Sequence, residues 1–189
     1  MTFRRPSLRA ALAWTAGLAV VGVLGMLLFV WSGVYNVAAS KGHLPITRWF
    51  LELGMRQSVA TQSLLERADQ PELSNGDLIR LGAGHFHGSC APCHGGPGLA
   101  ADPGFTHMLP PPPKLSEHVT QWKARELFWI VKHGLKYTGM PAWQAQSRDD
   151  EVWAVVAFLK QLPKLDQARY RKLADGNTAG RETGKSVPL

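Results

Sequence analysis

The sequence is poor in cysteine, in charge and in strand-like patterns. Among its 189 residues only Cys90 and Cys93 are cysteines, and 19% of the residues are charged. Two cysteines are too few for a disulfide-stapled scaffold. Hydrophobic residues make up 45% of the chain, too many for a disordered polypeptide. We find no convincing alternating pattern and no internal repeat. We therefore expect an all-α chain of one medium domain with an appendage, or of two very small domains.

Charge is missing altogether from residues 10–40, which contain no Asp, Glu, Lys, Arg or His. A helix over residues 10–31 would span about 33 Å, enough to cross a bilayer core. Arg4, Arg5 and Arg9 precede it. The positive-inside rule then predicts a cytoplasmic segment 1–9 and export of the rest of the chain.

Three other interpretations of this apolar run compete with a membrane anchor. A cleaved signal peptide has a possible small-residue site at residues 37–39, but its apolar core is usually shorter than this run. Arg4-Arg5 suggests a twin-arginine signal only weakly, because the flanking residues do not support it. A buried helix of a cytosolic protein is the last alternative. We predict a single-pass anchor in a bacterial inner membrane, with the following domain in the periplasm.

The exported part divides at a turn-rich segment. Residues 32–73 read as a juxtamembrane helix and linker, with Pro45 suited to a first helical turn. This helix has three possible neighbours: lipid, the domain or a partner. Apolar spacing then predicts helices over about 77–87, 123–133 and 147–162, and Ser74 followed by Asp77 resembles a capping box. Residues 164–189 are expected to form a partly disordered tail.

The chemistry of the chain is concentrated in Cys90-Ala91-Pro92-Cys93-His94. Cys-x-x-Cys-His is the pattern of c-type haem attachment. Two thiols about one turn apart reach the two vinyl groups of one porphyrin, and the following His94 then faces the iron as an axial ligand. The pattern predicts one covalently attached haem c held by Cys90, Cys93 and His94.

Three other interpretations of the two cysteines compete with haem attachment. A redox Cys-x-x-Cys pair would need a βαβ context that is absent. A zinc site would need a second pair of ligands, and the chain has no other cysteine. The third alternative is two unrelated free thiols.

The second axial ligand is expected to be a methionine, with a histidine or an open position as the alternatives. Three of the five methionines are unsuitable, because Met1 is the first residue, Met26 lies in the apolar run and Met55 precedes the linker. This leaves Met108 and Met140. Met140 is favoured because Gly139 and Pro141 build a fixed non-helical loop around it. Met108 comes soon after His94 and has less chain with which to cross the ring. A Met thioether would raise the reduction potential and close the iron to substrates.

In this order, Cys90-x-x-Cys93-His94, a proline-rich loop, Thr138-Gly139-Met140-Pro141 and a last apolar helix resemble monohaem class I cytochrome c over residues 74–163. The resemblance implies an all-α cytochrome c fold, with three main helices around the haem. It implies that the first and last helices cross, with Gly82 and Phe86 near Trp153 or Ala157. It also places one of Pro110–Pro113 beside His94, without fixing which. Candidates for the haem wall or a propionate contact are Trp122, Trp129, Tyr137 and Trp143.

These features predict an electron carrier and not an enzyme, since outer-sphere electron transfer needs no general base or nucleophile. The expected donor is a quinol- or substrate-oxidising dehydrogenase, and the expected acceptor a terminal oxidase or another cytochrome of a respiratory chain. The first alternative is a cytochrome subunit of a larger membrane-bound dehydrogenase or oxidase. The second is a haem sensor or peroxidase-like enzyme with an open distal position.

The basic net charge of +7 gives no support to nucleic-acid binding. Residues 74–163 contain eight Lys or Arg against seven Asp or Glu, which is too balanced for a phosphate-binding surface. Five basic residues lie between the haem motif and Met140 and would either rim the haem edge or form an ordinary solvated face: Lys114, Lys123, Arg125, Lys132 and Lys136.

Overall fold

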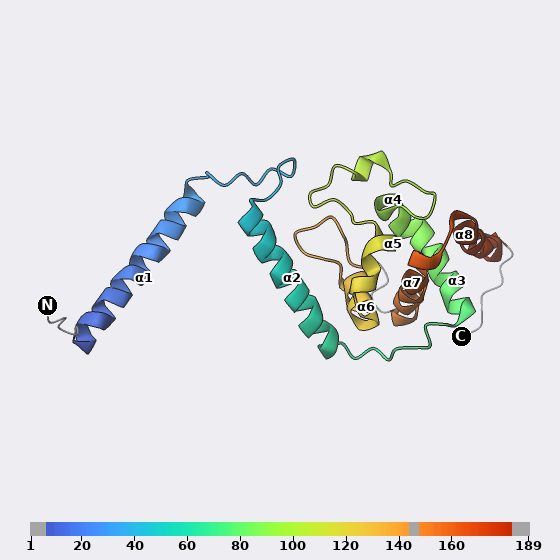
Figure 1. The fold of residues 1–189 in the computed structure, drawn as a ribbon, viewed down its shortest axis with the longest axis horizontal. Coiled ribbons are helices and arrows are strands. Elements are labelled where there is room, and N and C mark those ends of the chain that lie inside the picture. Colours follow the sequence, from blue (N-terminus) through green and yellow to red (C-terminus); the bar gives the residue numbers. More distant parts are fainter. Residues whose placement is uncertain (1–6, 144–147, 183–189) are drawn as a thin grey trace. The chain divides into compact units, whose positions relative to one another are not determined.

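The computed structural model describes residues 7–143 and 148–182, and within these ranges every regular element is a helix (Figure 1). The prediction of an all-α chain is confirmed. The chain separates into two compact units, Met1–Lys41 and Gly42–Leu189. The main helices are α1 (Leu8–Trp31), α2 (Pro45–Leu65), α3 (Gly76–His85), α6 (Ala124–His133), α7 (Asp149–Gln161) and α8 (Gln167–Glu182). Shorter elements are η1 (Phe86–Cys90), α4 (Ala91–His94), η2 (Pro103–Phe105), α5 (Leu115–His118), η3 (Val119–Gln121) and η4 (Leu162–Lys164).

The first unit is essentially the apolar helix α1. Its N-cap is Ser7, whose Oγ accepts a hydrogen bond from the Ala10 amide at 3.3 Å. No residue of α1 is buried, although apart from Arg9 and Thr15 its side chains are apolar or aromatic. Its length and composition fit a membrane span and support a single-pass anchor. The predicted cytoplasmic segment lies outside the described residues except for its last three.

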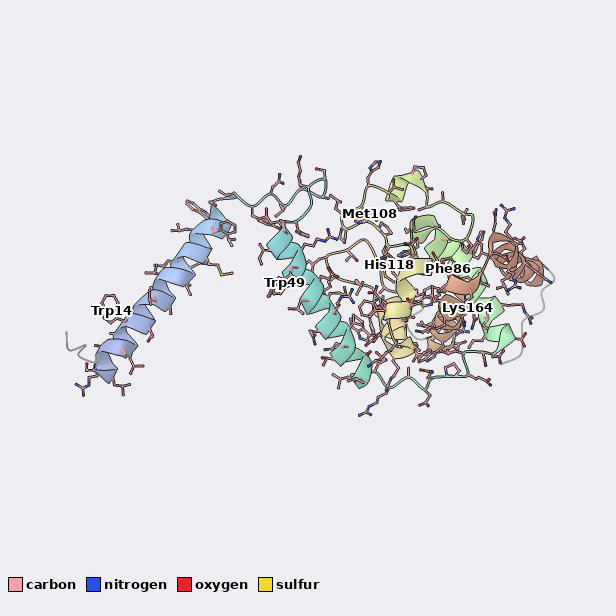
Figure 2. The ribbon with its side chains drawn as sticks, in the orientation of Figure 1. Trp14, Trp49, Phe86, Met108, His118 and Lys164 are labelled. Atoms are coloured by element: carbon pink, nitrogen blue, oxygen red, sulfur yellow. The ribbon has the colours of Figure 1, made fainter. Side chains whose placement is uncertain are left out.

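The second unit is organised around the crossing of α3 and α7, which lie side by side in Figure 1. Gly82 permits the close approach, because a Cβ there would overlap the Ala154 carbonyl and lie 3.0 Å from Phe158 Cβ. Phe86 packs against Phe158 with ring centroids 5.0 Å apart, between the two ribbons in Figure 2. The predicted helix crossing is therefore present, with contacts at Ala154 and Phe158, the residues next to the expected Trp153 and Ala157.

Packing continues past residue 163 into α8. Tyr170 is only 2% exposed, and its ring packs on Phe86 and Phe158. Its hydroxyl lies 2.9 Å from His87 Nδ1. The segment expected as a tail thus contributes a helix to the core, while the disorder expected at its end concerns residues 183–189, outside the described residues.

The juxtamembrane helix α2 packs on α6. Val59 and Ser63 are its buried residues, and Glu66, directly after the helix, pairs with Lys132 and His133 of α6. Of the three possible neighbours of this helix, the structure shows contact with the domain. Pro45 occupies its first turn as expected.

Two helix starts differ in detail from the sequence patterns. Asn75 caps α3, with its Oδ1 accepting from the amides of Asp77 and Leu78, so the Ser74 capping box is wrong. Ser74 instead bonds Glu72 at 2.6 Å. The start proposed for the last domain helix at Ser147 lies outside the described residues, and α7 begins at Asp149.

Candidate functional site

The Cys-x-x-Cys-His segment lies on a π-helical turn followed by one turn of α-helix. The turn η1 runs from Phe86 to Cys90, and α4 carries both Cys93 and His94. Phe86 and Ala91 are buried and fix the segment to the core. Gly95, with φ +66°, ends α4 in a conformation that L side chains rarely adopt. The core thus holds the motif in place from both ends.

Cys90 and Cys93 are half-buried and not joined by a disulfide. Burial raises the pKa of the Cys90 thiol to about 12, and the neighbouring Cys93 adds to the effect. The Cys90 side chain is thus a neutral thiol at physiological pH. The chemistry and spacing of the two cysteines fit covalent haem attachment.

His94 is oriented by the proline run. Its Nδ1 lies 2.9 Å from the carbonyl oxygen of Pro113. A carbonyl only accepts, so Nδ1 carries the proton and Nε2 keeps its lone pair. Burial lowers the pKa of His94, partly offset by the bond to Pro113, and this favours the neutral ring. This donor set fits an axial iron ligand with its second nitrogen fixed.

The loop that follows the motif is a tight turn packed against α8. Gly96 and Leu99 exchange backbone hydrogen bonds of 2.8 and 2.9 Å, and the Asp102 amide donates to the Pro92 carbonyl at 2.8 Å. A Cβ at Gly96 would lie 3.2 Å from the Tyr170 ring. This contact gives α8 a direct role in holding the loop after His94, which sequence reasoning missed.

The loop containing Met140 is pinned to the end of α6. The Leu135 amide donates to the Met140 carbonyl at 3.2 Å, and the Met140 amide donates to Thr138 Oγ1 at 3.1 Å. Gly134, with φ +66°, touches the backbone of residues 140–142 so closely that a Cβ there would lie 2.5 Å from the Pro141 carbonyl carbon. The fixed non-helical loop expected from the sequence is thus observed.

Met108 lies against this same loop. A Cβ at Gly139 would be 2.6 Å from the Met108 sulfur and 3.1 Å from its terminal methyl. Both methionines considered as ligands therefore meet at residues 139–140, and each is half-buried. Their spacing in the sequence gave no sign of this proximity.

The four aromatic candidates for the haem wall or a propionate contact lie in different environments. Tyr137 is 80% exposed, and Trp129 makes a tilted ring contact with His133 of its own helix, with the centroids 5.1 Å apart. Trp122 lies beneath the Arg56 guanidinium, 5.2 Å from its ring centroid. Trp143 packs on the core, and its buried Nε1 has no hydrogen-bond partner among the described residues. Trp143 is accordingly the candidate with a buried donor that lacks a partner in the described part of the chain.

The basic residues after the motif do not form one free rim. Lys132 bonds Glu66 at 3.1 Å and Asp149 at 2.7 Å, and Arg125 donates to the Glu66 carbonyl at 3.1 Å. Burial opposes charge on Lys132, but these two carboxylates outweigh it and raise its pKa. At least two of the five basic residues are therefore used to join helices.

Comparison with known proteins agrees with this geometry. Residues 77–159 match the family model described as cytochrome c oxidase, cbb3-type, subunit III. No curated protein and no solved structure matches the chain. The matched range contains the Cys90–His94 motif, the proline run, the Met140 loop and nearly all of α7. Residues 77–159 therefore form a class I c-type cytochrome domain, of a family that binds covalently attached haem c and transfers electrons through it.

Proposed function

We propose that the protein is a membrane-anchored electron carrier with one haem c, bound to Cys90 and Cys93 by thioether bonds and ligated axially by His94 and Met140. The bound haem supplies one-electron chemistry, its iron alternating between the ferric and ferrous states. The observation that carries the proposal is the 2.9 Å contact between His94 Nδ1 and the Pro113 carbonyl.

His94 is suited to its role because one hydrogen bond sets both its tautomer and its ring orientation. With Nδ1–H donated to Pro113, Nε2 is the only ring nitrogen left to bind a metal. The lowered pKa of His94, caused by burial, keeps a proton from competing for Nε2. A haem bound covalently to the preceding Cys93 would have its iron within reach of this nitrogen.

Met140 is the preferred second ligand because its backbone is held on both sides. Its amide and carbonyl are bonded to Thr138 and Leu135, and Gly134 fits tightly beneath it. Met108, by contrast, has its sulfur against Gly139, where it supports the loop. A rigid loop holds a thioether in a fixed position, as a ligand of constant geometry requires.

Trp143 is proposed as a donor to a haem propionate. Its Nε1–H is buried and has no partner among residues 7–143 and 148–182. An unsatisfied buried donor costs about 1–3 kcal/mol, and a carboxylate acceptor would remove that cost. Trp153 has the same kind of unpartnered Nε1, but its ring is stacked on Phe128 at 4.4 Å within the core.

The cellular setting follows from the anchor. We propose that α1 crosses a bacterial inner membrane, with the arginines before it in the cytoplasm and the haem domain in the periplasm. There the domain would take electrons from a quinol- or substrate-oxidising dehydrogenase and pass them to a terminal oxidase or another cytochrome in a respiratory chain. The chain's residues bind, orient and shield the redox centre, and no substrate bond is made.

The proposal is tested with the full chain purified in detergent after expression with the c-type maturation system. Intact mass and a pyridine haemochrome assay should give one covalent haem. The oxidised protein should show the weak sulfur-to-iron charge-transfer band, which Met140→Ala loses. The matched variant Met108→Ala should keep it. Loss of the band in Met108→Ala alone would assign the ligand to Met108, and its absence from the wild type would favour a sensor or peroxidase-like site.

A second candidate function is that of a cytochrome subunit in a larger membrane-bound oxidase or dehydrogenase. The family description, which names a subunit of a cbb3-type oxidase, favours it. Purification in a mild detergent, followed by identification of stoichiometric partners, separates a subunit from a free carrier. A carrier should elute alone with its haem spectrum intact.

A further inference from the structure

Helix α2 carries two apolar stripes, and only one of them is covered. Val59 and Ser63 are buried where the helix packs on α6. A second set lies at helical spacing on another side of α2 and is exposed to solvent, with Trp49 59% and Phe50 67% exposed. We define this outer stripe as Ile46, Trp49, Phe50 and Leu53.

The helix cannot turn to bury the outer stripe against the domain, because polar contacts fix its rotation. Arg56 lies over the Trp122 ring and donates to Gln121 at 3.1 Å. At the other end, Glu66 accepts from Lys132 at 3.1 Å and is 2.9 Å from His133 Nε2. Covering the outer stripe with the domain would break both sets of contacts.

The position of the outer stripe along the chain points to its partner. It occupies the first half of α2, the half into which the connector from α1 leads, as the position of Trp49 in Figure 2 shows. The connector, residues 32–44, spans at most about 45 Å even when extended. If α1 lies in a membrane, the start of α2 is always within that distance of the bilayer.

The charges around the outer stripe suit a lipid surface. Lys41 and Arg48 lie near its start, no acidic residue occurs between Ser32 and Leu51, and the charge of Glu52, which follows, is paired with Arg56 of the same helix. A helix that presents Trp and Phe beside basic side chains has the composition of an interfacial helix, attracted to anionic headgroups and buried by its apolar face.

We propose that the outer stripe docks on the surface of the bilayer in which α1 is anchored, with Arg48 near anionic phosphates. The docking holds the haem domain in one orientation against the membrane. It rests on the anchor and does not depend on which residues ligate the haem.

The test uses the full chain reconstituted in vesicles of phosphatidylcholine and phosphatidylglycerol in equal parts. A nitroxide label is attached to Trp49→Cys or to the matched variant Ser58→Cys, an exposed site on another side of α2. Power-saturation EPR then compares collisions with oxygen, which concentrates in lipid, and with a water-soluble nickel chelate. We expect the Trp49→Cys label about 5–10 Å below the headgroups and the Ser58→Cys label in water.

Other outcomes overturn the proposal. Equal access of nickel to both labels means that the outer stripe is solvated. Protection of the Trp49→Cys label from both reagents means that it is covered by protein, and dipolar broadening would identify that protein as a second copy. An unchanged label depth when Arg48→Gln is combined with Trp49→Cys, or when phosphatidylglycerol is left out, removes the charge argument.

The unsubstituted chain separates this proposal from the proposed function. If Cys90 and Cys93 are in thioether bonds, it takes up no label. Labelling of the unsubstituted chain would contradict covalent haem attachment, and Cys90→Ala with Cys93→Ala in the same chain would still allow the depth at residue 49 to be measured.

Discussion

Gly82→Ala should damage the protein more than its single added methyl group suggests. The new Cβ would overlap the Ala154 carbonyl and stand 3.0 Å from Phe158 Cβ. Both neighbours belong to α7, whose residues 152–159 are all buried, so the helices must separate by about 1.5 Å to restore ordinary contacts. Overpacking of this kind costs about 3 kcal/mol at the upper end of its usual range. The better helix propensity of Ala returns about 1 kcal/mol.

The expected net loss is therefore about 2 kcal/mol, which lowers the melting temperature by on the order of 10 °C for a domain of this size. Chemical unfolding of the haem-loaded chain, followed by circular dichroism, measures it. Gly76→Ala is the matched control, because it lies in the same helix and a Cβ there has no neighbour within 4 Å. If Gly82→Ala unfolds at the same midpoint as Gly76→Ala, the close crossing of α3 and α7 is refuted.

Three further predictions concern contacts outside this crossing. Gly139→Ala places a methyl 2.6 Å from the Met108 sulfur, so we expect a loss of about 1 kcal/mol in chemical unfolding that the double variant with Met108→Ala recovers. Tyr170→Ala should cost about 4 kcal/mol because it empties a buried site, whereas Tyr170→Phe should cost about 1 kcal/mol for one lost hydrogen bond. Glu66→Gln should raise amide hydrogen exchange across α2 at neutral pH. The pKa of Glu66 is lowered, chiefly by its bond to His133, so its contribution is present above its ordinary value of 4.5 and is lost as pH falls through the lowered value. Wild type and Glu66→Gln should therefore converge in acid.

Each of these three predictions can be checked against a matched variant of the same protein. Glu52→Gln removes another carboxylate of α2, one paired only within the helix to Arg56, and should leave exchange across α2 nearly unchanged. Equal exchange in both variants would mean that Glu66 does not hold α2 to α6. For Gly139→Ala, a loss that persists in the double variant would place the strain elsewhere than at Met108. Equal losses for the two Tyr170 variants would contradict the buried packing of the ring.

The helices and the cysteine motif were predictable because each depends on residues that are close together in the sequence. Three features can be recognised without reference to distant residues: the apolar run, the spacing of Cys90 and Cys93, and the apolar stripe of α7. Cap positions were less predictable. Ser74 and Asn75 are neighbours with the same capping chemistry, and only the backbone path decides that Asn75 is the cap.

The contacts that complete the site were not predictable, because they join distant segments. Four consecutive prolines offer the same carbonyl, and the course of the loop alone selects Pro113 for His94. Tyr170 stands in a charged stretch that resembles a solvated tail, and its burial depends on Phe86 and Phe158. The approach of Met108 to Gly139 has no local pattern at all.

The attachment of α2 to α6 also shortens the tether between the membrane anchor and the haem domain. Tether length determines the effective concentration of that domain near other proteins of the same membrane. With α2 held by Val59, Ser63 and Glu66, the length of chain free to move between the two units is residues 32–44 and not 32–75. Effective concentration falls roughly as the −3/2 power of tether length, so the shorter tether raises it about sixfold. Loss of the Glu66 contacts would therefore dilute the carrier around its anchor without altering its reduction potential.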